Sequence, residues 1–300
     1  MGRLILFGFS AAVHAYVGLR LAAGFTAWPW ALAALLAFSA VMIPVSLLGR
    51  RSHNGRFTES LAWLGMLCMG LFSSLFVLTL LRDVALLLAA ALSWLWPALL
   101  LTPAVETASA QSVLVLAALT TLIGFVSARR TAAVVRIDIP IAGLAVELHG
   151  FTIAQISDVH VGHTIKASYV RAVVDAVNRL KADMVAITGD LVDGSVAELR
   201  RHVAPLAELA SRHGTFFVTG NHEYYSGAHA WIAELRRLGV QVLMNEHVVL
   251  RHGGAGLIVA GVADYSAHHF DESHRSDPHA AIAGAPAAVA TRIQIGRAHV

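Results

Sequence analysis

Long apolar runs dominate the first 126 residues of the chain. They cover Leu4–Leu21, Ala31–Leu48, Leu61–Leu81, Val84–Leu101 and Ser112–Ala128. A helix that crosses the hydrocarbon core of a membrane needs about 20 such residues. A signal peptide has a single short apolar core, and buried helices of a soluble domain carry polar faces that these runs lack. The pattern therefore predicts a transmembrane anchor of four or five helices over residues 1–130.

The number of spans depends on Arg82 and Asp83, which interrupt the apolar stretch between the third and fourth runs. A charge at mid-membrane costs about 2.5–3.5 kcal/mol, so we expect both residues at an interface, as a neighbouring ion pair. Arg50, Arg51 and Arg56 indicate that the loop before the third run is cytoplasmic. Four spans would then leave the rest of the chain in the cytoplasm, and five would place it outside. The distribution of basic residues favours four spans, and the apolarity of the fourth run favours five. The rest of the chain can therefore lie on either side of the membrane.

A different pattern begins after Arg136. Short apolar runs predict strands at Phe151–Ile156, Met184–Thr188, Thr215–Thr219, Val240–Met244, His247–Leu250 and Leu257–Ala260. Helical spacing predicts helices at Ala167–Leu180, Val196–Arg212 and near His229–Leu238. The alternation of strands with helices predicts βαβ units, and the continuous apolar strands indicate a sheet covered on both faces. We therefore expect an α/β domain that follows the membrane anchor.

Composition agrees with this division. Hydrophobic residues make up 57% and charged residues 14% of the chain, where soluble domains carry about 25% charged residues. The net charge of +3 comes mostly from arginines that flank apolar runs. They are not interleaved with aromatic residues on a polar segment, so we expect no nucleic-acid binding. Cys68 is the only cysteine, which excludes an intrachain disulfide and a thiolate metal site.

Polar side chains follow each of the first three predicted strands. They are Asp158 and His160, then Asp190, then Asn221 and His222. In α/β sheets, ligands bind beyond the carboxyl ends of the strands, so we expect these residues to converge. Each alone is typical of an ordinary turn or helix cap, but together they would require three coincidences. Carboxylate, amide and imidazole ligands without sulfur suit Mn, Fe, Zn or Co.

These segments resemble a known family. Ile156–His160, Thr188–Asp193 and Gly220–Glu223 are similar to the first three sequence blocks of the calcineurin-like metallophosphoesterases. The N-terminal spans are similar to those of a membrane-bound bacterial branch. The resemblance implies a β-sandwich flanked by helices over residues 137–294. It also implies a multi-pass protein of the bacterial cell (inner) membrane.

The resemblance further implies a centre of two divalent metal ions. Asp158 and His160 would hold the first ion, Asp190 would bridge, and Asn221 would hold the second. A bridging hydroxide would attack a phosphomonoester or phosphodiester near the bilayer, including a lipid-linked one.

The same resemblance implies an acid for the reaction. His222 would protonate the leaving-group oxygen, and Asp193 or Glu223 would orient its ring.

The chain departs from the family pattern after Gly227. The family has a later strand-end histidine and a Gly-His-x-His block, whereas His252, His268, His269, His274 and His279 are weak substitutes and Gly296–His299 is only a loose imitation. Ile295–Val300 also matches one reading frame of a common sequencing adapter. We therefore expect residues 295–300 to be a non-native tail on a truncated domain that lacks three ligands and turns over weakly or not at all. Two alternatives are a lipid-precursor pyrophosphate hydrolase and a catalytically inactive membrane scaffold.

Overall fold

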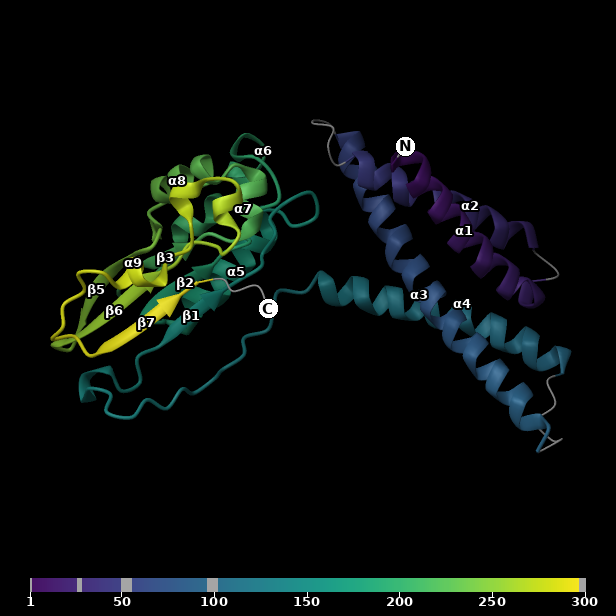
Figure 1. Cartoon of the computed structure of the whole chain (residues 1–300), viewed down its shortest axis with the longest axis horizontal. Coiled ribbons are helices and arrows are strands. Elements are labelled where there is room, and N and C mark those ends of the chain that lie inside the picture. Colours follow the sequence, from purple (N-terminus) through teal and green to yellow (C-terminus); the bar gives the residue numbers. More distant parts are fainter. Residues whose placement is uncertain (1, 26–28, 50–55, 96–101, 297–300) are drawn as a thin grey trace. The chain divides into compact units, whose positions relative to one another are not determined.

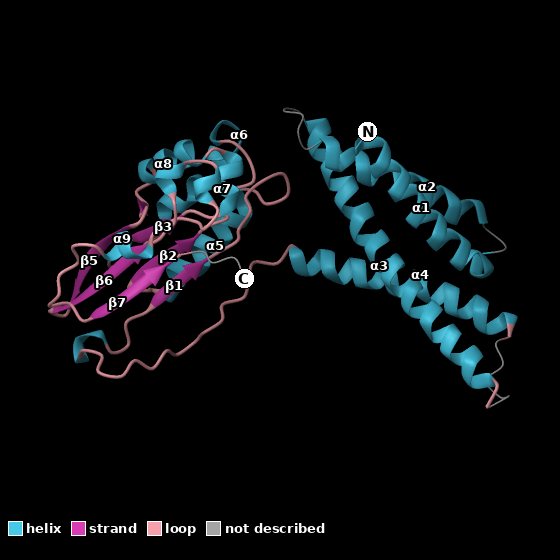
Figure 2. Ribbon diagram, viewed as in Figure 1, coloured by secondary structure: helices cyan, strands magenta, loops and turns pink. Residues whose placement is uncertain are grey.

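The computed structural model describes residues 2–25, 29–49, 56–95 and 102–296. The chain divides into two compact units, Met1–Arg130 and Thr131–Val300. Figure 2 shows that the described part of the first unit is built of helices, whereas the strands lie in the second. Each unit is described by itself below.

The first unit contains four long helices joined by short segments. They are α1 (Gly2–Leu21), α2 (Pro29–Gly49), α3 (Arg56–Ser93) and α4 (Pro103–Ala128). All four are long and apolar enough to cross a membrane. Their shared core includes Val17, Leu36 and Leu75, while many other large apolar side chains face outward. Outward-facing apolar side chains are what a lipid-facing bundle requires.

Helix α3 runs through Arg82 and Asp83 and joins the third and fourth apolar runs, and the placement of these two residues at a membrane interface stays a prediction. The Arg82 guanidinium donates to the backbone carbonyls of Arg20 (3.1 Å) and Glu106 (3.0 Å). Asp83 accepts from the Tyr16 hydroxyl (2.6 Å) and from Arg20 (2.7 Å), and pairs with Arg82 at 3.6 Å as expected. The charges are satisfied inside the bundle, so the helix need not end there. The last part of the fourth run, residues 96–101, lies outside the described residues.

The second unit begins with a parallel sheet in the order β1-β2-β3-β4. Its strands are β1 (Ile153–Ile156), β2 (Met184–Thr188), β3 (Thr215–Val218) and β4 (Gln241–Val242). The connecting helices that pack on it are α5 (Ala167–Leu180), α6 (Val196–Val203) and α8 (Ala228–Arg237). The predicted βαβ arrangement is confirmed, and Figure 1 shows it at the labelled strands.

Helix α6 is shorter than its predicted span of Val196–Arg212. It ends at Val203, and a 3₁₀ helix follows at Ala204–Glu208. Pro205 has no N–H with which to continue the α-helical hydrogen-bond ladder, so the helix tightens at this point.

A second sheet contains β5 (Glu246–His252), β6 (Ala255–Gly261) and β7 (Thr291–Ile295). Strand β7 was not predicted. It pairs in parallel with β6 and ends at Ile295, a residue that we assigned to the expected tail. Of that tail, residues 297–300 lie outside the described residues.

The two sheets pack face to face and share one core. Along β2, Val185 and Ile187 point into the core formed with the helices, whereas Met184 and Ala186 point into the core shared with the second sheet. This alternation is the period-2 geometry of a strand. The unit is thus a two-sheet sandwich with helices on the outer face of the parallel sheet, and it carries the candidate site at the carboxyl ends of β1, β2 and β3.

Candidate metal centre

The predicted site residues come together at one edge of the parallel sheet. Asp158 and His160 follow β1, and Asp190 follows β2. Asn221 and His222 are the first residues of helix α7 (Asn221–Ser226), which begins directly after β3. Because the three strands are parallel and adjacent, their ends bring these side chains to one place.

The backbone is strained at three of these residues. Asp158, His160 and Asp190 have φ angles of 58°, 51° and 50°. Residues with a side chain avoid this left-handed region, at a cost of order 1–3 kcal/mol each, and those that adopt it cluster at functional sites. The loops are held by backbone bonds from Asp158 N to Gly189 O (3.3 Å) and from His160 N to Asp190 O (3.1 Å). The strain turns the side chains toward one another.

Two glycines allow the loops to approach closely. A Cβ on Gly189 would lie 2.5 Å from the backbone nitrogen of Gly220. A Cβ on Gly220 would collide with the Asp190 carboxylate. The two glycines therefore bring the loop backbones into close contact, and any larger residue at Gly220 would displace Asp190.

The candidate ligand atoms lie at metal-bridging distances. His160 Nε2 is 4.0 Å from Asp158 Oδ1 and 4.0 Å from Asp190 Oδ2. Two atoms that each lie about 2.0–2.2 Å from one ion can be no more than about 4.4 Å apart. Single ligand atoms of His160, Asp190 and His222 also fall within 4.8 Å of one another. Asp190 is only 2% exposed, so its carboxylate is the buried centre of the group.

The Asn221 amide faces the Asp190 carboxylate. With its NH₂ group inward, the amide donates to the two carboxylate oxygens, at 3.1 and 3.2 Å. A rotation of the amide by 180° brings its oxygen to the same position, which is the orientation that a metal ion would require. Carboxylate, amide and imidazole donors together fit a divalent metal ion such as Mn, Fe, Zn or Co.

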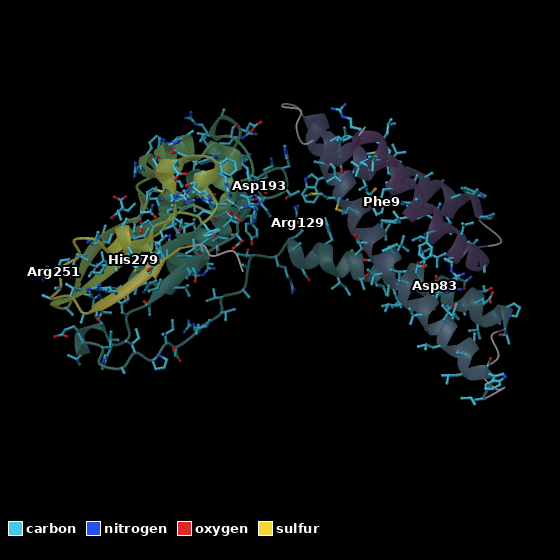
Figure 3. The ribbon with its side chains drawn as sticks, in the orientation of Figure 1. Phe9, Asp83, Arg129, Asp193, Arg251 and His279 are labelled. Carbon is cyan, nitrogen blue, oxygen red and sulfur yellow. The ribbon has the colours of Figure 1, made fainter. Side chains whose placement is uncertain are left out.

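Asp193 contacts both histidines of the site. Its Oδ1 lies 3.1 Å from His160 Nδ1 and 2.5 Å from His222 Nδ1, and Figure 3 labels this side chain. The two rings are perpendicular, with centroids 4.5 Å apart. A bond from Nδ1 to a carboxylate fixes the ring and leaves Nε2 as the reactive nitrogen. The sequence indicated the contact with His222, but gave no sign of the one with His160.

Glu223 does not have the expected position beside His222. Its side chain is 1% exposed and accepts four backbone N–H bonds: from Gly220 (2.7 Å), Leu191 (2.8 Å), Asp190 (3.0 Å) and Val192 (3.3 Å). Burial raises the pKa of this carboxyl to about 7, and the backbone donors oppose the rise. Glu223 therefore fastens the loop after β2 to the start of α7, so that Asp190 and Asn221 keep their separation.

The later histidines are engaged elsewhere in the described part of the chain. His252 bonds His213 at 3.0 Å, while His268 and His269 stack on each other with ring centroids 4.0 Å apart. His274 bonds the Tyr224 hydroxyl at 3.1 Å. His299, in the loose imitation of the last family block, lies outside the described residues.

The comparisons with known proteins agree with this geometry. Residues 151–280 match the family model described as calcineurin-like phosphoesterase. A bovine (Bos taurus) transmembrane protein with metallophosphoesterase domain is 39% identical over 154 residues, which are 49% of this chain and 35% of the relative. An uncharacterized metallophosphoesterase of Helicobacter pylori is 42% identical over 112 residues, which are 37% and 29% of the two chains.

A third relative has a named substrate. The UDP-2,3-diacylglucosamine pyrophosphatase LpxG of Chlamydia trachomatis is 33% identical over 78 residues, 26% of this chain and 24% of the relative. The chain matches about a third or less of the length of these relatives. Both bacterial and eukaryotic proteins are among them, so the similarity is not restricted to a bacterial branch. Within those limits, the second unit carries a calcineurin-like metallophosphoesterase domain over residues 151–280.

Proposed function

We propose that this chain hydrolyses phosphate esters with two divalent metal ions bound at the carboxyl ends of β1, β2 and β3. The observation that carries the proposal is the meeting of Asp158, His160 and Asn221 around the buried carboxylate of Asp190. The backbone N–H of His222 donates to this carboxylate at 3.1 Å, and divalent cations among the surrounding ligands would compensate its buried charge.

The residues divide naturally between two ions. Asp158 and His160 would hold one ion, Asn221 the other, and Asp190 would contribute to both. Such a pair of ions lowers the pKa of a bound water and neutralises the charge of a phosphate group. The strained loops hold the ligands in place before substrate arrives, which reduces the reorganisation required during the reaction.

His222 has the position of a general acid. Its Nδ1 is bonded to Asp193, so Nε2 is the atom able to give a proton to the leaving-group oxygen. The ring is about one-third exposed, which allows it to meet a substrate from solvent. Tyr225 packs against it with ring centroids 5.4 Å apart and restricts its rotation. Positioned proton transfer of this kind contributes about 10²–10⁴-fold to a rate.

The location that we propose is the bacterial cell (inner) membrane, with several spans in the bilayer; the four apolar helices support a membrane location. We take α3, which joins two of the five apolar runs, as a single span; with four spans, Arg129, Arg130 and Arg136 fall on the same side as the N-terminus. The excess of basic residues on that side favours a catalytic domain in the cytoplasm. A tethered domain favours substrates at the bilayer surface, including lipid-linked phosphates.

A pyrophosphate hydrolase that acts on a lipid precursor is the second candidate. The similarity to the Chlamydia pyrophosphatase and the apolar helices favour it. A pyrophosphate bond and a phosphodiester place comparable charge between two metal ions, so the two functions share one site. They differ in whether a pyrophosphate-linked lipid is cleaved faster than a simple diester.

The test is hydrolysis of a chromogenic phosphodiester and of a pyrophosphate-linked lipid by the full chain in detergent. We expect Mn²⁺-dependent turnover that is weak in this chain, since three ligands of the family pattern are missing, that chelation removes, and that Asp190→Asn lowers by at least about 100-fold. Asp175→Ala, on the exposed face of α5, serves as the control and should leave turnover unchanged. Turnover that is indifferent to chelation and to Asp190→Asn would refute the two-metal proposal, and no metal-dependent turnover on either substrate would favour an inactive scaffold.

A further inference from the structure

A second group of metal-binding side chains lies outside the centre described above. It consists of His229, Asp271 and His274, each of which offers one ligand atom within 4.8 Å of the other two. His229 lies in the first turn of α8, whereas Asp271 and His274 lie in or next to a 3₁₀ helix at Glu272–His274. None of the three residues belongs to the strand-end site. The cluster joins two segments about 40 residues apart in the sequence.

A carboxylate oxygen of Asp271 and a ring nitrogen of His229 lie close together. His229 Nε2 lies 2.8 Å from Asp271 Oδ2. The other carboxylate oxygen, Asp271 Oδ1, accepts from the backbone N–H (2.9 Å) and the hydroxyl (2.6 Å) of Ser273. These bonds fix the carboxylate with Oδ2 toward the histidines. The rings of His229 and His274 have centroids 4.8 Å apart.

A buried hydrogen-bond chain supports His274 from behind. His274 Nδ1 lies 3.1 Å from the Tyr224 hydroxyl. That hydroxyl lies 3.3 Å from Thr219 Oγ1, and Thr219 Oγ1 donates to Met244 Sδ at 4.0 Å. When His274 Nδ1–H donates to the Tyr224 hydroxyl and that hydroxyl donates to Thr219 Oγ1, all three hydrogen bonds have one donor and one acceptor. His274 then carries its hydrogen on Nδ1. Its Nε2 then has a lone pair for a metal ion. Carboxylate or hydroxyl partners behind a metal-binding histidine commonly fix the tautomer in this way.

His274 is partly buried, and its ring is held by the bond to the Tyr224 hydroxyl. His229 is 73% exposed and can turn toward the other two ligands without disturbing the core.

We propose that His229, Asp271 and His274 bind a divalent transition-metal ion, with Zn²⁺ as the best fit. Two imidazoles, one carboxylate and an open fourth position form a common zinc ligand set. Ligand atoms about 2.0–2.1 Å from a tetrahedral zinc ion lie about 3.4 Å apart. The His229–Asp271 pair, at 2.8 Å, would open slightly, and no pair would have to close by more than about 1.4 Å.

The ion would fasten the segment around Phe270 onto α7 and α8. Phe270 packs against Tyr224 and Tyr225, with ring centroids 5.7 and 5.4 Å apart. Tyr225 in turn packs against His222 of the strand-end site. The second ion would therefore stabilise the side of α7 that carries the acid residue, without contacting the substrate.

The test is a Zn²⁺ titration of the full chain in detergent against a competing chelator dye. The parent protein for this titration carries both Asp158→Asn and Asp190→Asn, so that the strand-end site no longer contributes to Zn²⁺ binding. We expect the parent to bind one equivalent of Zn²⁺. His229→Ala and His274→Ala should each lower the affinity by at least about 10-fold, and Tyr224→Phe should lower it by about 10–100-fold through loss of the bond to His274.

His268→Ala is the matched control, because His268 lies in the same segment and bonds only the Tyr265 carbonyl, at 3.0 Å, among the hydrogen bonds of the described residues. It should bind Zn²⁺ as the parent does. The thermal midpoint without metal should be the same in the parent and in His229→Ala, since this side chain is largely exposed. Zn²⁺ affinity within twofold of the parent in both His229→Ala and His274→Ala, or no bound Zn²⁺ in the parent, would overturn the proposal.

Discussion

Replacing Asp193 by alanine should weaken metal binding and slow proton donation together. One oxygen of this carboxylate holds the Nδ1 atoms of both His160 and His222, at 3.1 and 2.5 Å. In Asp193→Ala both rings lose the partner that aims Nε2 at the site. Asp193 is 40% exposed, so its removal leaves no unpaired buried charge and the fold should remain intact.

The magnitude follows from the two contacts. Loss of a carboxylate behind a metal-binding histidine costs about 10–100-fold in metal affinity, which equals about 1.4–2.8 kcal/mol. We expect this loss for Mn²⁺ through His160. At saturating Mn²⁺ the His222 contact should account for a further fall in kcat of about 10–100-fold on esters with poor leaving groups. The fall should be smaller for p-nitrophenyl esters, whose leaving group needs little help from an acid.

Mn²⁺ affinity and kcat are measured separately, on one alkyl and one p-nitrophenyl ester. Asp193→Asn should lose less than Asp193→Ala, because the amide oxygen can still accept from both rings. Asp175→Ala again serves as the exposed control. In the His222→Gln background, Asp193→Ala should still lower Mn²⁺ affinity but should have little further effect on kcat. Mn²⁺ affinity and kcat both within twofold of the unmodified chain would refute this role of Asp193.

Three further predictions concern other parts of the molecule. Gly220→Ala should lower Mn²⁺ affinity by at least about 10-fold and stability by about 1–3 kcal/mol, because the new Cβ collides with the Asp190 carboxylate; unchanged Mn²⁺ binding in a calorimetric titration would contradict this. Arg82→Leu should lower the thermal midpoint of the first unit in detergent, because the carbonyls of Arg20 and Glu106 lose their donor and Asp83 keeps Arg20 but loses its second arginine, whereas the exposed Arg3→Leu should not. Burial and the neighbouring His252 lower the pKa of His213, so the folded protein binds fewer protons than the unfolded chain below about pH 6.5. Stability in urea should therefore fall as the pH drops below that value, and the fall should be smaller in His213→Gln; an identical pH dependence in the two proteins would disprove this contribution.

Much of the catalytic unit could be predicted from local patterns. Buried strands such as Met184–Thr188 are continuous apolar runs, and the polar residues that follow them mark the site. Strand β7 and helix α7 were missed because one is short and exposed on alternate residues, and the other is a six-residue helix without apolar periodicity.

Long-range contacts explain what sequence patterns could not predict. Arg82 and Asp83 signal a break in an apolar helix only if no partners exist, and their partners lie on other helices more than 20 residues away. The pairing of His229 with Asp271 depends in the same way on folding, since neither residue follows a predicted strand. Glu223 accepts bonds from a loop about 30 residues earlier in the chain, so only the folded structure distinguishes a backbone clamp from a partner of His222.

Mn²⁺ binding followed by electron paramagnetic resonance tests the central claim most directly, because it requires no knowledge of the substrate. The unmodified chain and Asp190→Asn are titrated with Mn²⁺ in detergent, and the signal of free Mn²⁺ reports the bound fraction. The arrangement of ligands around Asp190 predicts Mn²⁺ binding by the unmodified chain and an affinity at least about 10-fold lower in Asp190→Asn. Equal Mn²⁺ affinity in the two proteins would contradict a metal centre at the ends of these three strands.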